Sequence, residues 1–129
     1  MPKSKGRILV VEDNADEAQM VKMILEPEGY GVTLAADGQQ GLEKACAERP
    51  DLIILDVMMP VLDGFSMCAR LRNEPQNREI PVILLTGVAE RVRDTKYPLD
   101  GVLRAEVQDY LEKPVEPAAL VATVAQWLG

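Results

Sequence analysis

Short apolar runs separated by helix-like segments set the pattern of the chain. Three uninterrupted runs of four apolar residues start at Ile8, Leu52 and Val82. Such runs are typical of strands that are buried on both faces of a parallel sheet, since a strand with one solvated face alternates apolar and polar residues. Weaker runs at 31–35 and around Tyr110 complete five predicted strands.

The segments between these runs carry apolar residues at helical spacing. One helix is predicted from about Ala15 to Glu26, and Pro27 and Gly29 stop it. A second helix ends at Arg49-Pro50, a third follows Asp63 as its cap and ends before Pro75, and the last opens at Pro117. The residues expected on their buried faces are Ala18, Val21, Ile24, Leu25, Leu42, Ala45, Cys46, Phe65, Cys68, Ala69, Leu71, Leu120, Val121, Val124, Trp127 and Leu128.

The region 87–107 is the weakest helical pattern. It contains Pro98 and Gly101 and only scattered apolar positions. Proline removes a helical hydrogen bond and glycine lowers helix propensity, so we expect this fourth helical region to be broken or partly irregular.

Strands that alternate with helices predict an α/β fold built from right-handed βαβ units. The expected architecture is a doubly wound five-stranded parallel sheet of order 2-1-3-4-5, a flavodoxin-like three-layer sandwich. At 129 residues the chain fits a single domain over 1–129, with 1–6 expected to be a disordered extension. No apolar stretch has the length of a membrane span or a secretory signal, so the expected compartment is the cytoplasm.

Composition removes several classes of function. A net charge of −7 argues against nucleic-acid binding, which usually needs a basic patch. The chain has no histidine, which excludes Ser-His-Asp and Cys-His nucleophile systems and any phosphohistidine on this chain. Cys46 and Cys68 lie far apart without zinc-ligand spacing, and we expect both as packed, reduced thiols. Trp127, Phe65 and the methionines are expected in the core.

Charged and hydroxyl residues follow four of the predicted strands. Glu12-Asp13 come after the first, Asp56 after the third, Thr86 after the fourth and Lys113 after the fifth. They would meet at the carboxyl edge of the sheet, where open α/β folds bind ligands. Clustered carboxylates repel one another by roughly 1 kcal/mol per close pair in water and by more in a drier cleft. The cluster therefore predicts a cation, and oxygen ligands favour Mg²⁺, with Asp13 and Asp56 as direct ligands and Glu12 acting through water.

Each of these residues also has a purely structural interpretation. Glu12 and Asp13 could be the acidic first turn of a helix, Asp56 and Thr86 could be caps, and Lys113 could be a solvated surface lysine. The repetition at the ends of four strands favours the site.

Four segments carry a family resemblance. ILVVEDN at 8–14, DLIILDVMMPVLDGF at 51–65, IPVILLTG at 80–87 and YLEKPV at 110–115 resemble the receiver domains of two-component response regulators in order and spacing. The resemblance implies that Asp56 accepts a phosphoryl group from a phosphohistidine on a sensor histidine kinase or a histidine phosphotransfer protein. It also implies that the backbone carbonyl of Met58 joins Asp13 and Asp56 on Mg²⁺, while Thr86 and Lys113 contact the phosphoryl group.

Further positions take their interpretation from the same resemblance. The Lys113-Pro114 bond is expected to be cis, and Gly64 is expected to adopt a loop conformation that other residues resist. Tyr110 matches a switch aromatic, although a tyrosine on an edge strand is often only packing. The stretch from Thr86 to Lys113 is longer than usual for the family and lacks the common Gly-Ala pair.

Three functional classes follow. The first is a phosphorylation-dependent switch, a phosphoacceptor rather than an enzyme, which assists its own phosphorylation and, with apolar Met58 and Val88, loses the phosphoryl group slowly. Its output would pass through Thr86, Tyr110 and the stretch 88–107 to an unknown effector protein, with no nucleic acid or membrane bound. The second is a pseudo-receiver that binds partners without phosphorylation. The third is a Mg²⁺-dependent phosphatase or small-molecule enzyme, which typically has a second Asp where Met58 stands.

Overall fold

A five-stranded parallel sheet forms the centre of the molecule. The computed structural model describes residues 6–56, 64–77, 79–86 and 109–128. The strand order is β2-β1-β3-β4-β5, which confirms the predicted α/β class and sheet order. The strands are β1 (Gly6–Val11), β2 (Tyr30–Ala35), β3 (Leu52–Asp56), β4 (Val82–Thr86) and β5 (Asp109–Glu112).

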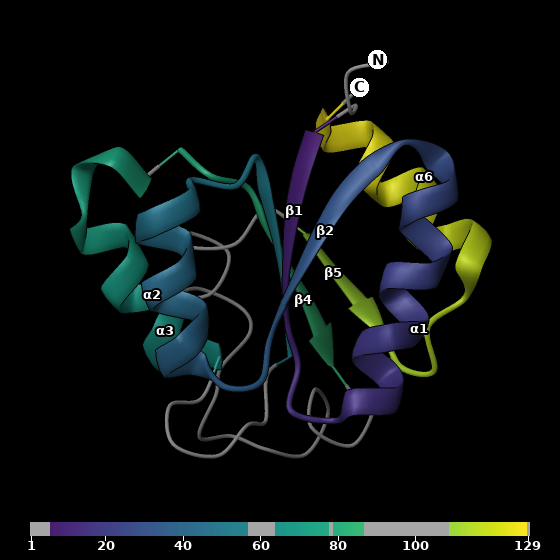
Figure 1. Ribbon diagram of the computed structural model, residues 1–129, viewed down its shortest axis with the longest axis horizontal. Coiled ribbons are helices and arrows are strands. Elements are labelled where there is room, and N and C mark those ends of the chain that lie inside the picture. Colours follow the sequence, from purple (N-terminus) through teal and green to yellow (C-terminus); the bar gives the residue numbers. More distant parts are fainter. Residues whose placement is uncertain (1–5, 57–63, 78, 87–108, 129) are drawn as a thin grey trace.

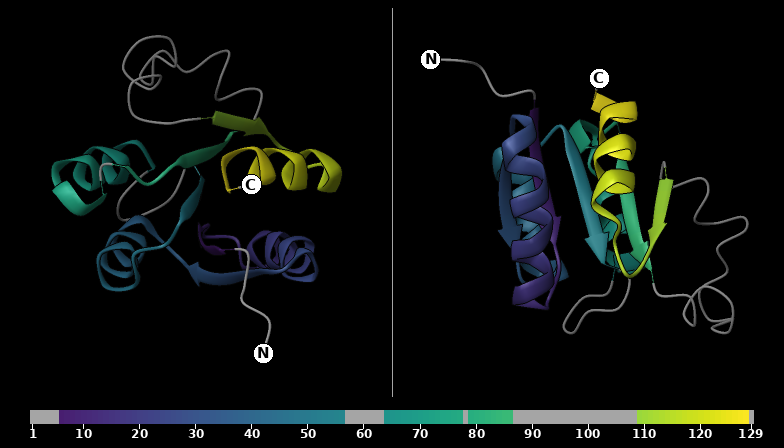
Figure 2. Two further views of the ribbon diagram at one scale, coloured as in Figure 1. Left: turned by 90° about the horizontal axis from the view of Figure 1, so that it is seen from above. Right: turned by 90° about the vertical axis from the view of Figure 1, so that its right-hand side faces the viewer.

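Helices cover both faces of this sheet. Figure 1 shows α2 and α3 on one side of the strands and α1 and α6 on the other, and the views in Figure 2 show the same three layers. The helices are α1 (Ala15–Leu25), α2 (Gly38–Glu48), α3 (Gly64–Asn73) and α6 (Pro117–Leu128), with short 3₁₀ turns η1 (Glu26–Glu28) and η2 (Pro75–Asn77). In the described part of the chain, no helix is long and apolar enough to cross a membrane. The expected irregular helical region at 87–107 lies outside the described residues.

Each four-residue apolar run supplies two separate cores. Successive side chains of a strand point to opposite faces, so neighbours in one run pack under different helices. Leu9 and Val11 pack under α2 and α3, whereas Ile8 and Val10 pack under α1 and α6. The runs of β3 and β4 divide in the same way, with Ile53, Leu55, Val82 and Leu84 on the first side and Leu52, Ile54, Ile83 and Leu85 on the second. This double burial is the reason why these strands lack alternation.

Local signals fix the ends of the helices close to the predicted positions. The Asn14 side chain caps α1 by accepting a hydrogen bond from the Glu17 amide at 3.0 Å. After α1, Gly29 has a φ of 105°, a left-handed conformation that glycine adopts without strain. Gly41 lets α2 approach the sheet closely, because a Cβ at this position would lie 2.7 Å from Val11 Cγ2.

Several expectations about burial are wrong. Cys46 is exposed rather than packed, since Ala45 takes the inward position of α2, and the Asn77 side-chain amide donates to Cys46 Sγ at 3.5 Å. Trp127 is also exposed, and its indole N–H donates to Asp109 Oδ2 at 3.3 Å, which holds the ring at the surface. Met67 is buried, but Met20 and Met23 are exposed on α1, and Ala69 of α3, which was expected on a buried face, is exposed as well.

Two smaller points concern the ends of elements. Gly6 belongs to β1, where it pairs with Tyr30, and is therefore not part of a disordered extension. The side chains of Phe65 and Cys68 lie outside the part of the chain that the structure describes, as does the predicted cap Asp63.

Candidate functional site

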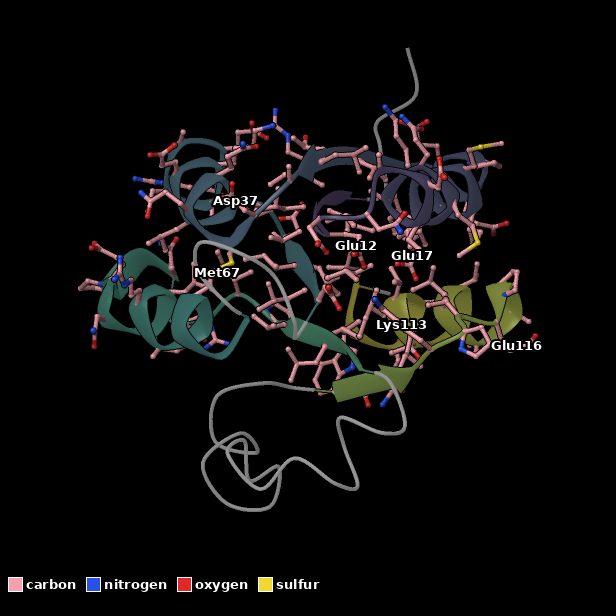
Figure 3. All side chains as sticks on the ribbon, turned by 90° about the horizontal axis from the view of Figure 1, so that it is seen from below. Glu12, Glu17, Asp37, Met67, Lys113 and Glu116 are labelled. Carbon is pink, nitrogen blue, oxygen red and sulfur yellow. The ribbon has the colours of Figure 1, made fainter. Side chains whose placement is uncertain are left out.

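The register of the sheet brings the predicted residues together at its carboxyl edge. Val11 of β1 lies opposite Leu55 of β3, so Glu12 and Asp56 occupy equivalent positions at the ends of adjacent strands. Asp56 in turn lies opposite Leu85, the residue before Thr86. Parallel strands end at one edge, so residues that are remote in the sequence become neighbours. Figure 3 looks onto this edge, where Lys113 points toward Glu12 and Glu17.

Three carboxylates form the acidic part of the site. Glu12 and Asp56 are buried, whereas Asp13 is exposed. One carboxylate oxygen from each of the three lies within 4.8 Å of the others. This crowded set of hard oxygen donors fits a divalent cation such as Mg²⁺, which binds through one or two carboxylates and keeps several of its waters.

Among the residues that the structure describes, Lys113 supplies the positive charge of the site. Its Nζ lies 3.0 Å from Asp56 Oδ1 and 3.2 Å from Glu12 Oε2, where it donates a hydrogen bond. Burial alone would lower the pKa of Lys113, but the hydrogen bond and charge of Asp56, followed by those of Glu12, raise it above its ordinary value. Lys113 is therefore charged throughout the physiological range and offsets part of the negative charge of the two buried carboxylates. The interpretation of Lys113 as a solvated surface lysine is wrong.

Opposing influences act on the pKa of the Glu12 carboxyl. The pKa of the Glu12 carboxyl is raised from 4.5 to about 7, chiefly by burial and to a smaller extent by the charge of Asp56. The Asn14 amide, which donates to Glu12 Oε1 at 3.1 Å, and the nearby Lys113 both lower it. Glu12 thus gains and loses a proton near neutral pH, and the net charge of the site changes with it.

The remaining predicted site residues are described only in part. The backbone of Thr86 ends β4 and that of Tyr110 lies in β5, but their side chains lie outside the described part, so their roles stay predictions. Met58 also lies outside it, and Gly64 is the first residue of α3. The peptide bond between Lys113 and Pro114 is cis, as the resemblance implied.

Glu17 is a site residue that the sequence analysis did not identify. Its Oε2 lies 3.6 Å from Lys113 Nζ, and its side chain is 40% exposed at the mouth of the site. The sequence did hold a signal, because Glu17 follows the helix cap Asn14 by three residues. That spacing, however, predicts helix capping and not contact with a lysine about a hundred residues away.

A family model and curated relatives match this chain over most of its length. Residues 8–125 match the model of the response regulator receiver domain. The response regulator PleD of Caulobacter vibrioides is 38% identical over 92% of this chain, but the chain spans only 25% of that protein. An uncharacterised 14.6 kDa protein of Leptolyngbya boryana is 38% identical over 93% of this chain and 88% of its own length.

Solved structures agree with these matches. The receiver domain of the sensor histidine kinase PA1611 from Pseudomonas aeruginosa, solved with a magnesium ion coordinated in its active-site cleft, has a TM-score of 0.84 and 36% identity and covers 96% of this chain and 98% of its own. The chemotaxis protein CheY4 of Vibrio cholerae has a TM-score of 0.82 and 32% identity, over 98% of this chain and 99% of its own.

Proposed function

Because this chain belongs to the response regulator receiver family, we propose that it is a phosphorylation-dependent signalling switch whose phosphoacceptor is Asp56. One observation carries the proposal. Asp56 is a buried carboxylate at the end of a central strand, and it is held against both a lysine and two further carboxylates. A carboxylate that served only to cap a strand end would need neither set of neighbours. The proposal treats residues 1–129 as a single receiver domain.

In the proposed reaction an Asp56 carboxylate oxygen attacks phosphorus. The new oxygen–phosphorus bond forms as the bond from phosphorus to the imidazole nitrogen of the donor breaks, and that nitrogen leaves with the electron pair. Such a reaction needs little covalent chemistry from the protein and depends on alignment and on positive charge near the equatorial oxygens. Lys113, already 3.0 Å from Asp56, is placed to supply one such charge.

The acidic set would hold Mg²⁺. Asp13 and Asp56 are the proposed direct ligands together with the Met58 carbonyl, and Glu12 acts through water. When bound, the ion neutralises the crowded carboxylates and the oxygens of the transferred group. The magnesium ion in the active-site cleft of the PA1611 receiver domain, at 36% identity, supports Mg²⁺ as the cation of the site.

The phosphohistidine donor must lie outside residues 1–129, which contain no histidine. The proposed donor is the phosphohistidine of a sensor histidine kinase or of a histidine phosphotransfer protein. In the proposed switch Thr86 and Tyr110 respond to phosphorylation and, with the stretch 88–107, present the change to an effector protein. The protein is then a phosphoacceptor that assists its own reaction and slow self-dephosphorylation. The cytoplasmic location stays a prediction.

Intact-mass measurement after incubation with acetyl phosphate and Mg²⁺ tests the proposal. The expected result is the gain of one phosphoryl group. No gain is expected when the metal is chelated before the phosphodonor is added, or in Asp56→Asn. The matched control is Asp51→Asn, an exposed aspartate just before the same strand, which should label like the wild type. Full labelling of Asp56→Asn would move the acceptor elsewhere. An unchanged mass with acetyl phosphate, phosphoramidate and a phosphohistidine donor would favour a pseudo-receiver.

A further inference from the structure

Glu17 is the third carboxylate on Lys113, and it differs from the other two in position. Asp56 and Glu12 contact the ammonium group at 3.0 and 3.2 Å from inside the site. Glu17 approaches it at 3.6 Å from α1, on the side open to solvent. At that separation the contact is one of charge rather than a hydrogen bond. The Lys113 ammonium group is thus attracted toward the buried carboxylates on one side and toward partly exposed Glu17 on the other.

The first turn of α1 shows why Glu17 is available for this contact. A glutamate three residues after a helix cap commonly accepts a hydrogen bond from the amide of the capping residue. Here the amide of Asn14 donates to Glu12 Oε1 instead, at 3.1 Å. Meanwhile the Asn14 side chain fixes the Glu17 backbone by accepting from its amide at 3.0 Å. The Glu17 backbone is held in place while its carboxylate is left to face Lys113.

We propose that Glu17 is a positioning residue that restrains Lys113 at the mouth of the site and thereby slows phosphorylation of Asp56. The inference rests on the proposed function and deepens it. When an Asp56 oxygen attacks acetyl phosphate, the bond from phosphorus to the acetate oxygen breaks and acetate leaves with the electron pair. Lys113 has to turn its donors toward the transferred oxygens during this step. Every carboxylate that retains Lys113 opposes that turn, and Glu17 is the one that can be removed without disturbing a buried group.

The expected effect is moderate because the Glu17 side chain is partly exposed. Glu17→Gln should raise the rate of labelling by acetyl phosphate about two- to fivefold, the range that the strength of an exposed ion pair corresponds to. Glu17→Asp keeps the charge but is one methylene shorter, so its rate should lie between those of Glu17→Gln and the wild type. Asp16→Asn is the matched control. It removes the same charge from the adjacent exposed position, and among the described side chains Lys113 pairs with Glu12, Glu17 and Asp56 and not with Asp16.

A second measurement needs neither metal nor phosphodonor. The side-chain resonance of Lys113, assigned by its loss in Lys113→Arg, should shift in metal-free Glu17→Gln and stay in place in Asp16→Asn. A faster rate with an unshifted resonance would mean that Glu17 merely repels the anionic donor, and the inference would be overturned. Equal rates in Glu17→Gln and Asp16→Asn would overturn it as well, while leaving the proposed function intact. If the wild type gains no phosphoryl group from any donor, both proposals fall together.

Discussion

Leu55 and Asp56 are adjacent in β3 and almost equally buried, yet their surroundings have opposite energetic consequences. Leu55 is fully enclosed by apolar side chains of the sheet and of α2 and α3. Asp56, 3% exposed, is a charge taken out of water and placed beside two further carboxylates. Burial of Leu55 stabilises the fold through the hydrophobic effect, whereas burial of Asp56 has a desolvation cost that Lys113 only partly offsets.

The difference between the sheet interior and its carboxyl edge indicates how stability and chemistry are divided in this fold. Packing of the interior fixes the register of the strands. The strand ends therefore hold like charges close together at the edge. The carboxylates at this edge repel one another in the free protein. Binding of a cation relieves that repulsion and therefore stabilises the protein. Truncation of a buried apolar side chain in the interior should therefore lower the free energy of unfolding, whereas neutralisation of a buried carboxylate at the edge should raise it.

The largest effect is expected in the interior. Leu55→Ala removes a fully buried side chain under α2 and α3, and the free energy of unfolding should fall by about 4 kcal/mol, within the range for cavity-forming substitutions. Urea denaturation followed by circular dichroism measures it. Met23→Ala is the control, since Met23 is 70% exposed and its truncation should cost less than about 0.5 kcal/mol. Similar losses in both variants would contradict the assignment of the core.

The second prediction concerns pH and reverses the sign. The pKa of Glu12 is raised from 4.5 to about 7, chiefly by burial, so the folded state holds a proton that the unfolded state has released. Stability contributed by this group therefore falls as pH rises from about 4.5 to 7. Without metal, Glu12→Gln should be more stable than the wild type by about 2 kcal/mol at pH 8, and the difference should vanish near pH 4.5. A constant difference across this range would show that Glu12 does not titrate in it.

Removing the cation of the edge should cost less. Lys113→Met removes the ammonium group that contacts Asp56 and Glu12. Without metal, the free energy of unfolding at pH 8 should fall by about 1.5 kcal/mol, between the values for exposed and buried ion pairs, because the Lys113 side chain is 23% exposed. The loss should be smaller at pH 6, because Glu12 then takes up a proton. Lys22→Met on α1 is the matched control. A loss in Lys113→Met that does not depend on pH would separate Lys113 from the titration of Glu12.

The interior was easier to predict from the sequence than the edge was. Runs such as Leu52–Leu55 report burial on both faces directly, and the sheet order followed from the alternation of strands and helices. The positions of Glu12, Asp13, Asp56 and Lys113 could also be predicted, because each follows a strand and parallel strands end together.

Side-chain direction at the helix surfaces could not be read in the same way. Cys46 lies one residue beyond Ala45, and helical spacing alone does not fix which of the two faces inward. Trp127 has a large apolar ring that suits the core, but its indole N–H donates a hydrogen bond to Asp109 at the surface. Glu17 is available to Lys113 because the Asn14 amide donates its hydrogen bond to Glu12 and not to Glu17. The sequence does not show which of these two carboxylates accepts it.

The smallest effect is expected in the ranking of the two acidic neighbours by Mg²⁺ affinity. Asp13 is exposed and none of its interactions ties it to Lys113 among the described contacts, so Asp13→Asn removes a proposed ligand without compensation. Glu12→Gln removes a charge that is proposed to act through water and that is already shared with Lys113 at 3.2 Å. At pH 8 we expect Asp13→Asn to weaken Mg²⁺ binding about tenfold and Glu12→Gln about threefold, a difference below about 1 kcal/mol. Titration calorimetry is the suitable measurement, because Trp127 lies beside Asp109 at the start of β5, away from the carboxyl edge, and is a poor optical reporter. Asp16→Asn gives the effect of lost charge alone. Losses of equal size in Asp13→Asn and Glu12→Gln would mean that the direct and water-mediated roles have been assigned to the wrong residues.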